Sequence, residues 1–77
     1  MMFTTIHNGK KYRMDYNPTF NTSFLVHKSD GRYIYMNSEM TWKFRDAVSY
    51  VPNQKWIDFD DIYEWIWTNA GFHRYAA

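Results

Sequence analysis

Cysteine does not occur in this chain of 77 residues. Disulfide bonds, thiolate zinc sites and a thiol nucleophile are therefore all excluded. A domain of this length is near the size at which a single hydrophobic core supplies only a few kcal/mol of net stability. The protein has to reach that stability without the cross-links that many small domains use.

Glycine and proline are also scarce, with three and two residues scattered along the chain. No linker is visible, so we expect one compact domain spanning residues 1–77. No stretch approaches the ~20 consecutive apolar residues that a membrane span requires. Residues 1–7 lack the charged and apolar regions of a secretory signal. We therefore expect a soluble, cytoplasmic protein without a membrane partner.

Aromatic residues, in contrast, are abundant. Four tryptophans, seven tyrosines and six phenylalanines make up 22% of the chain. Aromatic side chains bury more area than any others and dominate both protein cores and interfaces. We hypothesise that so small a domain has more rings than its interior holds, which leaves some of them for a partner.

The first two-thirds of the chain predicts two β-hairpins. Residues 3–7 and 11–16 are rich in β-formers, and Asn8 and Gly9 between them are typical of a tight turn with positive φ at both positions. Alternation in the second strand directs three side chains toward the core, namely Tyr12, Met14 and Tyr16.

The second hairpin joins residues 23–27 and 32–36 through a turn containing Asp30 and Gly31. Both strands are apolar at successive positions. Two arrangements fit this pattern: strands covered on both faces, or strands with one aromatic face left exposed.

A first helix is expected from a cap at Asn37 or Ser38 to about Tyr50, with Pro52 closing it. Its apolar positions fall on one stripe: Met40, Phe44, Ala47, Val48 and Val51. Trp42 points away from that stripe.

The second helix has clearer boundaries. Asp58 is the expected cap with Asp61 at the third helical position, Ile57 and Ile62 form a hydrophobic staple, and Gly71 ends the helix in a left-handed conformation. One face is apolar (Phe59, Ile62, Tyr63, Ile66, Trp67 and Ala70) and the opposite face is polar (Asp60, Asp61, Glu64 and Thr68). The aromatic tail, residues 72–77, is expected to dock. Two hairpins followed by two helices predict an α+β fold, with a three- to four-stranded antiparallel sheet covered on one face.

Charge is unevenly distributed. Residues 1–57 contain eight Lys and Arg against four Asp and Glu, a net +4, whereas residues 58–77 contain one Arg against four acidic residues, a net −3. Such a division either steers association or reflects ordinary solvated faces.

Catalytic and metal-binding patterns are missing. The histidines (His7, His27 and His73) lack metal-ligand spacing. The acidic residues at positions 58–64 could be read as a cation site, but helix capping already explains part of this cluster. No serine lies in a nucleophile elbow. We expect a non-enzymatic protein without a cofactor or a metal.

Protein binding is the function class that the sequence favours. Trp42, off its stripe, and Trp65, at the edge of the second helix's apolar face, are the candidate anchors, because tryptophan is enriched at interface hot spots. The charged rim would comprise Lys43, Arg45, Asp61 and Glu64. The competing interpretation is that both tryptophans fill a satellite core with Phe72 and Tyr75.

Nucleic-acid binding is the alternative. Its candidate residues combine cations with rings that could stack on bases: Lys11, Arg13, Arg32, Tyr33 and Tyr35. The sequence pI of about 8.0 is low for this class.

As a whole, a cysteine-free chain rich in Tyr, Trp, Asn and Met, with an acidic and tryptophan-rich block at residues 56–67, resembles small accessory proteins of tailed bacteriophages, the host-takeover and anti-defence factors. The resemblance implies a host protein as partner, a location in the host cytoplasm and inhibition by steric occlusion. It rests on no defining motif, so no functional residue is carried over from it.

Overall fold

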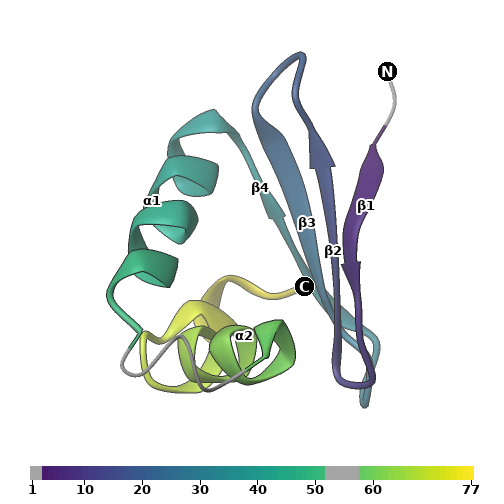
Figure 1. Ribbon diagram of the computed structural model, residues 1–77, viewed down its shortest axis with the longest axis vertical. Coiled ribbons are helices and arrows are strands. Elements are labelled where there is room, and N and C mark those ends of the chain that lie inside the picture. The colour runs from purple at the N-terminus through teal and green to yellow at the C-terminus, as the bar shows by residue number, and fades with distance from the viewer. Residues whose placement is uncertain (1–2, 52–57) are drawn as a thin grey trace.

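The computed structural model describes residues 3–51 and 58–77, and it shows a four-stranded sheet followed by helices (Figure 1). The strands lie in the order β1-β2-β3-β4, each antiparallel to its neighbour. Both α-helices lie on the same side of the sheet. The predicted α+β fold is confirmed. The elements are β1 Thr4–Asn8, β2 Tyr12–Asn17, β3 Thr22–His27, β4 Arg32–Met36, α1 Ser38–Ser49, α2 Phe59–Thr68 and the 3-10 helix η2 Phe72–Tyr75.

The first hairpin forms as predicted, but its turn differs from the expected one. Residues 9–11 link the strands, and the Gly9 amide donates to the Tyr12 carbonyl at 2.9 Å. In the described ranges, positive φ occurs at Asn21, Gly31 and Gly71, so neither Asn8 nor Gly9 adopts it. The longer turn has a physical cause described below: its amides surround a carboxylate from α2.

The second hairpin settles which of the two sheet arrangements applies. Gly31 adopts φ 75° in the turn, and its amide donates to the His27 carbonyl at 2.9 Å. Alternate side chains on β3 and β4 face the helices and are buried, among them Leu25, Ile34 and Met36. Their neighbours Tyr33 and Tyr35 point away and are 44% and 52% exposed. One sheet face is therefore aromatic and open.

Helix α1 begins where the sequence predicts. The Asn37 side chain accepts from the Met40 amide at 2.9 Å and satisfies a free N–H of the first turn. Its apolar stripe faces the core, with Phe44 buried, while Trp42 is 60% exposed as expected. Pro52 lies outside the described residues.

Helix α2 also begins at its predicted cap, because Asp58 accepts from the Asp61 amide at 3.0 Å. Ile57, the other half of the predicted staple, lies outside the described residues. Most of the predicted apolar face is buried (Ile62, Tyr63, Ile66 and Trp67). Two positions differ from the expected pattern: Phe59 is 52% exposed, whereas Asp60 is only 9% exposed.

The C-terminal tail docks, as its aromatic content predicts. Gly71 adopts φ 78° after α2 has ended, and the chain then forms η2 with Phe72 buried in the core. The Ala77 amide donates to the Tyr33 carbonyl at 2.8 Å, which ties the tail to β4. Among the described helices, none is long and apolar enough to cross a bilayer.

Candidate binding surfaces and the buried aspartate

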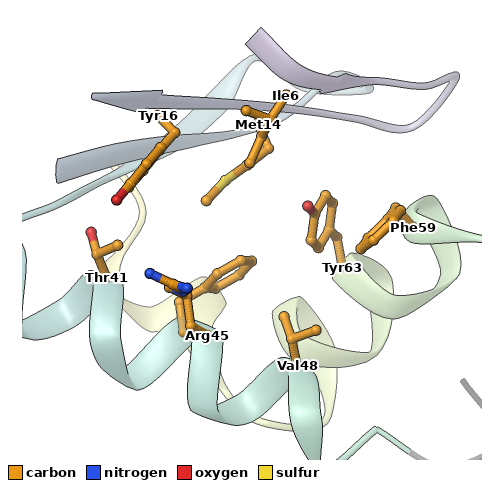
Figure 2. A pocket seen from close by; sticks show the side chains of 9 residues that line it. Ile6, Met14, Tyr16, Thr41, Arg45, Val48, Phe59 and Tyr63 are labelled. Carbon is orange, nitrogen blue, oxygen red and sulfur yellow. The ribbon is translucent and has the colours of Figure 1, made fainter. Parts of the chain in front are cut away.

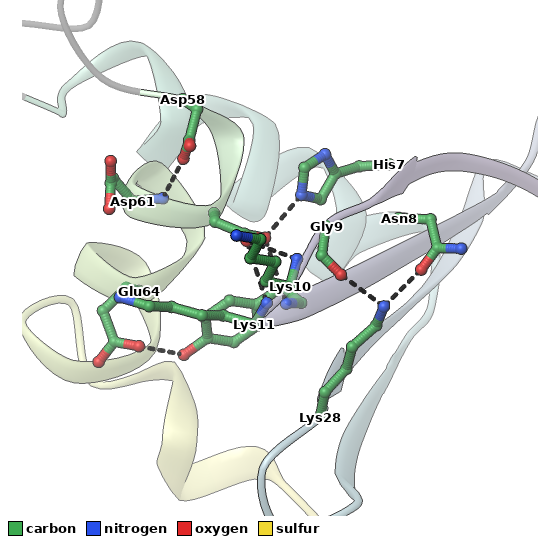
Figure 3. Close-up of polar contacts among 11 residues, drawn as sticks. His7, Asn8, Gly9, Lys10, Lys11, Lys28, Asp58, Asp61 and Glu64 are labelled. Carbon is green, nitrogen blue, oxygen red and sulfur yellow. Dashed lines mark hydrogen bonds and ion pairs between the residues drawn. The ribbon is translucent and has the colours of Figure 1, made fainter.

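Asp60, in the first turn of α2, holds the β1–β2 turn against that helix through hydrogen bonds to His7 and to the backbone amides of the turn, including those of Lys10 and Lys11. His7, Lys10 and Lys11 are labelled in Figure 3. His7 Nε2 donates to the Asp60 carboxylate at 2.7 Å, and the backbone amides of Lys10, Lys11 and Tyr12 donate at 2.9, 3.0 and 3.2 Å. A carboxylate accepts only, so His7 Nε2 carries the hydrogen. The four bonds explain why this acidic residue, predicted on the polar face, is buried.

Burial by itself would raise the pKa of Asp60, but hydrogen bonds from His7 and the three amides outweigh burial and lower the pKa below its ordinary 3.8. The stabilising contribution of the carboxylate is therefore complete above pH 3.8 and is lost as the pH falls through the lower folded-state pKa. We predict that the gap in unfolding free energy between wild type and Asp60→Asn shrinks below about pH 4. Urea titrations from neutral to acidic pH measure it; a gap independent of pH would refute the assignment.

Gly9 is required by the Asp60 carboxylate rather than by a positive φ. A Cβ at this position would lie 2.6 Å from Asp60 Cγ, well inside van der Waals contact. We predict that Gly9→Ala destabilises the protein by about 1–3 kcal/mol. In an Asp60→Ala background the same change is expected to cost less than ~0.5 kcal/mol, because the overlapping group is gone. Equal costs in both backgrounds, measured by urea unfolding, would show that the overlap is not the cause.

Glu64, predicted as part of a partner-binding rim, is engaged within the protein. The Tyr12 hydroxyl donates to its carboxylate at 3.0 Å (Figure 3). Burial, followed by the hydrogen bond to Glu64, raises the pKa of Tyr12 far above its ordinary 10.0. Trp65 is half-buried and packs against the main hydrophobic core. Asp61 keeps an exposed side chain.

The predicted residues on α1 form a separate group. The Arg45 guanidinium carbon lies 4.9 Å from the centre of the Trp42 ring, and Lys43 pairs with Glu39 at 3.8 Å. Within residues 3–51 and 58–77, no ring contact or ion pair joins this group to Trp65 or the acidic residues of α2. The contacts therefore do not unite the predicted patch.

The more continuous aromatic surface lies on the sheet face away from the helices, which we call the outer face. Its residues are Phe3, Phe24, Val26, Tyr33 and Tyr35, together with Arg13 and Asp15, which lie on β2 opposite Val26 and Phe24 of β3. Phe24 is central: its ring centre lies 5.0 Å from Phe3, 5.8 Å from Tyr33 and 5.1 Å from Tyr35. These spacings are typical of interacting aromatic pairs.

The predicted nucleic-acid-binding residues divide between two sides of the sheet. Arg13 lies on the outer face with Tyr33 and Tyr35, but it pairs with Asp15 at 3.2 Å. Arg32 lies on the helix side, 5.7 Å from the Trp67 ring centre, and donates to the His73 carbonyl at 3.3 Å. Lys11 lies apart from both groups. It lines a hollow near the turns, together with Lys10, His27, Lys28, Ser29 and Glu64.

A second hollow opens on the helix side, between α1 and the strands β1 and β2 (Figure 2). We call it the groove. Its volume is about 410 Å³. The residues that line it include Ile6, Met14, Phe44, Arg45, Phe59 and Tyr63. Arg45, a predicted rim residue, thus belongs to a site that the sequence did not indicate.

The three histidines each have a partner inside the protein. His7 binds Asp60, His27 Nδ1 lies 2.8 Å from Asp30 Oδ1, and His73 Nδ1 donates to the Trp67 carbonyl at 2.7 Å. In the described parts of the chain, no group of three or more His, Asp or Glu residues is placed to hold a metal ion. Neither a known protein family, nor a curated protein, nor a solved structure matches this chain.

Proposed function

We propose that this chain is a small protein-binding module and that its contact surface is the outer face of the sheet. The observation that carries the proposal is the ring cluster of Phe24, Tyr33 and Tyr35, which none of the described helices covers and whose two tyrosines are about half exposed. A domain that leaves a connected aromatic cluster in water is expected to cover it with a partner.

The composition of the outer face fits a protein interface. Tyrosine is enriched at interface hot spots. Here the rings cluster around Phe24, and the charges beside it on β2, Arg13 and Asp15, form an ion pair with each other at 3.2 Å. The rings project from a hydrogen-bonded sheet, so little conformational entropy is lost when they dock.

The resemblance to phage accessory proteins supports a host protein as the partner and inhibition as the outcome. The proposed mechanism is steric occlusion: a rigid aromatic face covers a functional surface of the target. This mechanism requires affinity and shape but no catalytic group, in keeping with the lack of a catalytic motif in the sequence.

Single-stranded nucleic acid is the second candidate ligand. Tyr33 and Tyr35 project from the same face of one strand, and Arg13 lies on that face of the sheet, an arrangement in which bases stack on rings. The Asp15 carboxylate beside Arg13 opposes phosphate binding, which is why we place this function second.

Affinity capture at graded salt concentrations tests the proposal. The immobilised chain is exposed to nuclease-treated bacterial extract, and we expect it to retain a host protein at stoichiometric amounts. Separately, labelled oligonucleotides are titrated, and we expect no binding with the steep salt dependence of phosphate contacts. Retention of oligonucleotides but of no protein would overturn the proposal in favour of the second candidate.

A further inference from the structure

The groove between α1 and the sheet has apolar walls from four elements. Helix α1 packs mainly over β3 and β4, and α2 packs over β2, and the groove lies beside them against Ile6 of β1 and Met14 of β2. Met14 and Phe44 form the buried floor. Ile6 and Phe59, at 57% and 52% exposure, are more open than their apolar character favours.

Of the described residues that line the groove, Arg45 is the one that carries a charge. Among the described residues, no carboxylate lies within ion-pair distance of its guanidinium. The group instead rests against the Trp42 ring, a cation–π contact that restricts its orientation. The polar side of the groove thus presents a cation that has no anion.

Tyr63 supplies a second polar group. Its side chain is directed into the groove (Figure 2), the residue is only 4% exposed, and no residue in the described ranges hydrogen-bonds its hydroxyl. Burial, and then the charge of Asp60, raises the pKa of Tyr63 to about 12. At neutral pH this hydroxyl is therefore a protonated donor with no acceptor among the described residues.

We propose that the groove binds a small amphiphile with an unbranched apolar chain and a single carboxylate. The carboxylate would accept from Arg45 and from the Tyr63 hydroxyl, and the chain would lie against Met14, Phe44 and Phe59. The volume of about 410 Å³ falls within the range of small-molecule sites, about 300–1,000 Å³. One guanidinium and one phenol match one singly charged, planar anion.

A peptide added to the β1 edge fits the structure less well. The β1–β2 register shifts between Thr5 and His7, at the segment beside the groove. Such a bulge interrupts the regular row of backbone groups that strand addition uses. A small ligand does not need a regular row of backbone hydrogen-bonding groups. Its binding in the groove is also independent of any contact made by the outer face.

Calorimetry with three ten-carbon probes, each below its micelle-forming concentration, tests the proposal. We expect decanoate to bind saturably with one site per chain, decanol more weakly and decyltrimethylammonium not at all. Arg45→Gln is expected to weaken decanoate by about tenfold or more while leaving decanol almost unchanged. Phe59 would contact only the alkyl chain of the ligand. Phe59→Ser is therefore expected to weaken the binding of both decanoate and decanol.

Lys43→Gln is the matched control, because Lys43 lies on the same helix, is exposed and does not line the groove. It should leave decanoate binding unchanged, and circular dichroism confirms that each variant is folded. Three outcomes overturn the proposal: no saturable decanoate binding, equal decanoate affinity in Arg45→Gln, or equal binding of the cationic probe. Decanoate-induced NMR shifts confined to the outer face would likewise overturn it.

Discussion

Replacing Asp60 with alanine is expected to lower the free energy of unfolding by about 3–5 kcal/mol. The carboxylate accepts from His7 and from three backbone amides of the β1–β2 turn. Its removal leaves these donors without their acceptor in a largely buried place, and each unsatisfied group costs about 1–3 kcal/mol unless water reaches it. The turn then loses its attachment to α2.

Asp61→Ala is the matched control for this prediction. Asp61 is the next residue, also acidic and also in the first turn of α2, but its side chain is exposed. Its replacement should change stability by no more than ~0.5 kcal/mol. Urea unfolding at neutral pH compares the two variants. A similar small cost for both would mean that the Asp60 bonds contribute little beyond the helix-dipole interaction that both residues share.

The second large effect concerns the outer face. Tyr33→Thr together with Tyr35→Thr is expected to weaken partner binding by at least a hundredfold, about 2.7 kcal/mol. Threonine retains β-sheet propensity while removing the ring, so the sheet should stay folded. Titration calorimetry with the captured partner measures the loss, and the thermal midpoint reports on the fold.

Tyr50→Thr and Trp42→Ala complete that comparison. Tyr50 is 73% exposed but lies at the end of α1, away from the outer face, so its replacement should leave affinity unchanged. Trp42→Ala tests the surface that the sequence indicates. If Trp42→Ala removed more than ~2 kcal/mol while the double tyrosine variant bound normally, the contact surface would be α1.

Local signals in the sequence were sufficient for most of the fold. Alternation placed Tyr12 and Met14 in the core, and Asn37 and Asp58 formed the expected caps. These features depend on a residue and its near neighbours, so spacing reveals them. The prediction of a tight turn at Asn8 was wrong because the turn depends on a distant residue. A carboxylate about fifty residues away in the sequence accepts from the turn amides and determines the length of the turn.

The candidate site was less predictable. Asp60 has the same acidic character as its exposed neighbour Asp61, so no local pattern separates them. Arg32 precedes Tyr33 directly, and adjacent strand residues point to opposite faces, which places them on different sides of the sheet. The groove is lined by residues of both α1 and α2, so it depends on how the two helices pack. From the sequence, Arg45 was predicted only as a charged neighbour of Trp42.

NMR mapping of the isotope-labelled chain against the captured protein shows whether the outer face contacts the partner. We expect the largest shift changes and intensity losses at Phe24, Tyr33, Tyr35 and Arg13, with α1 and α2 little affected. Changes concentrated around Trp42 and Trp65, with β3 and β4 unperturbed, would contradict this expectation.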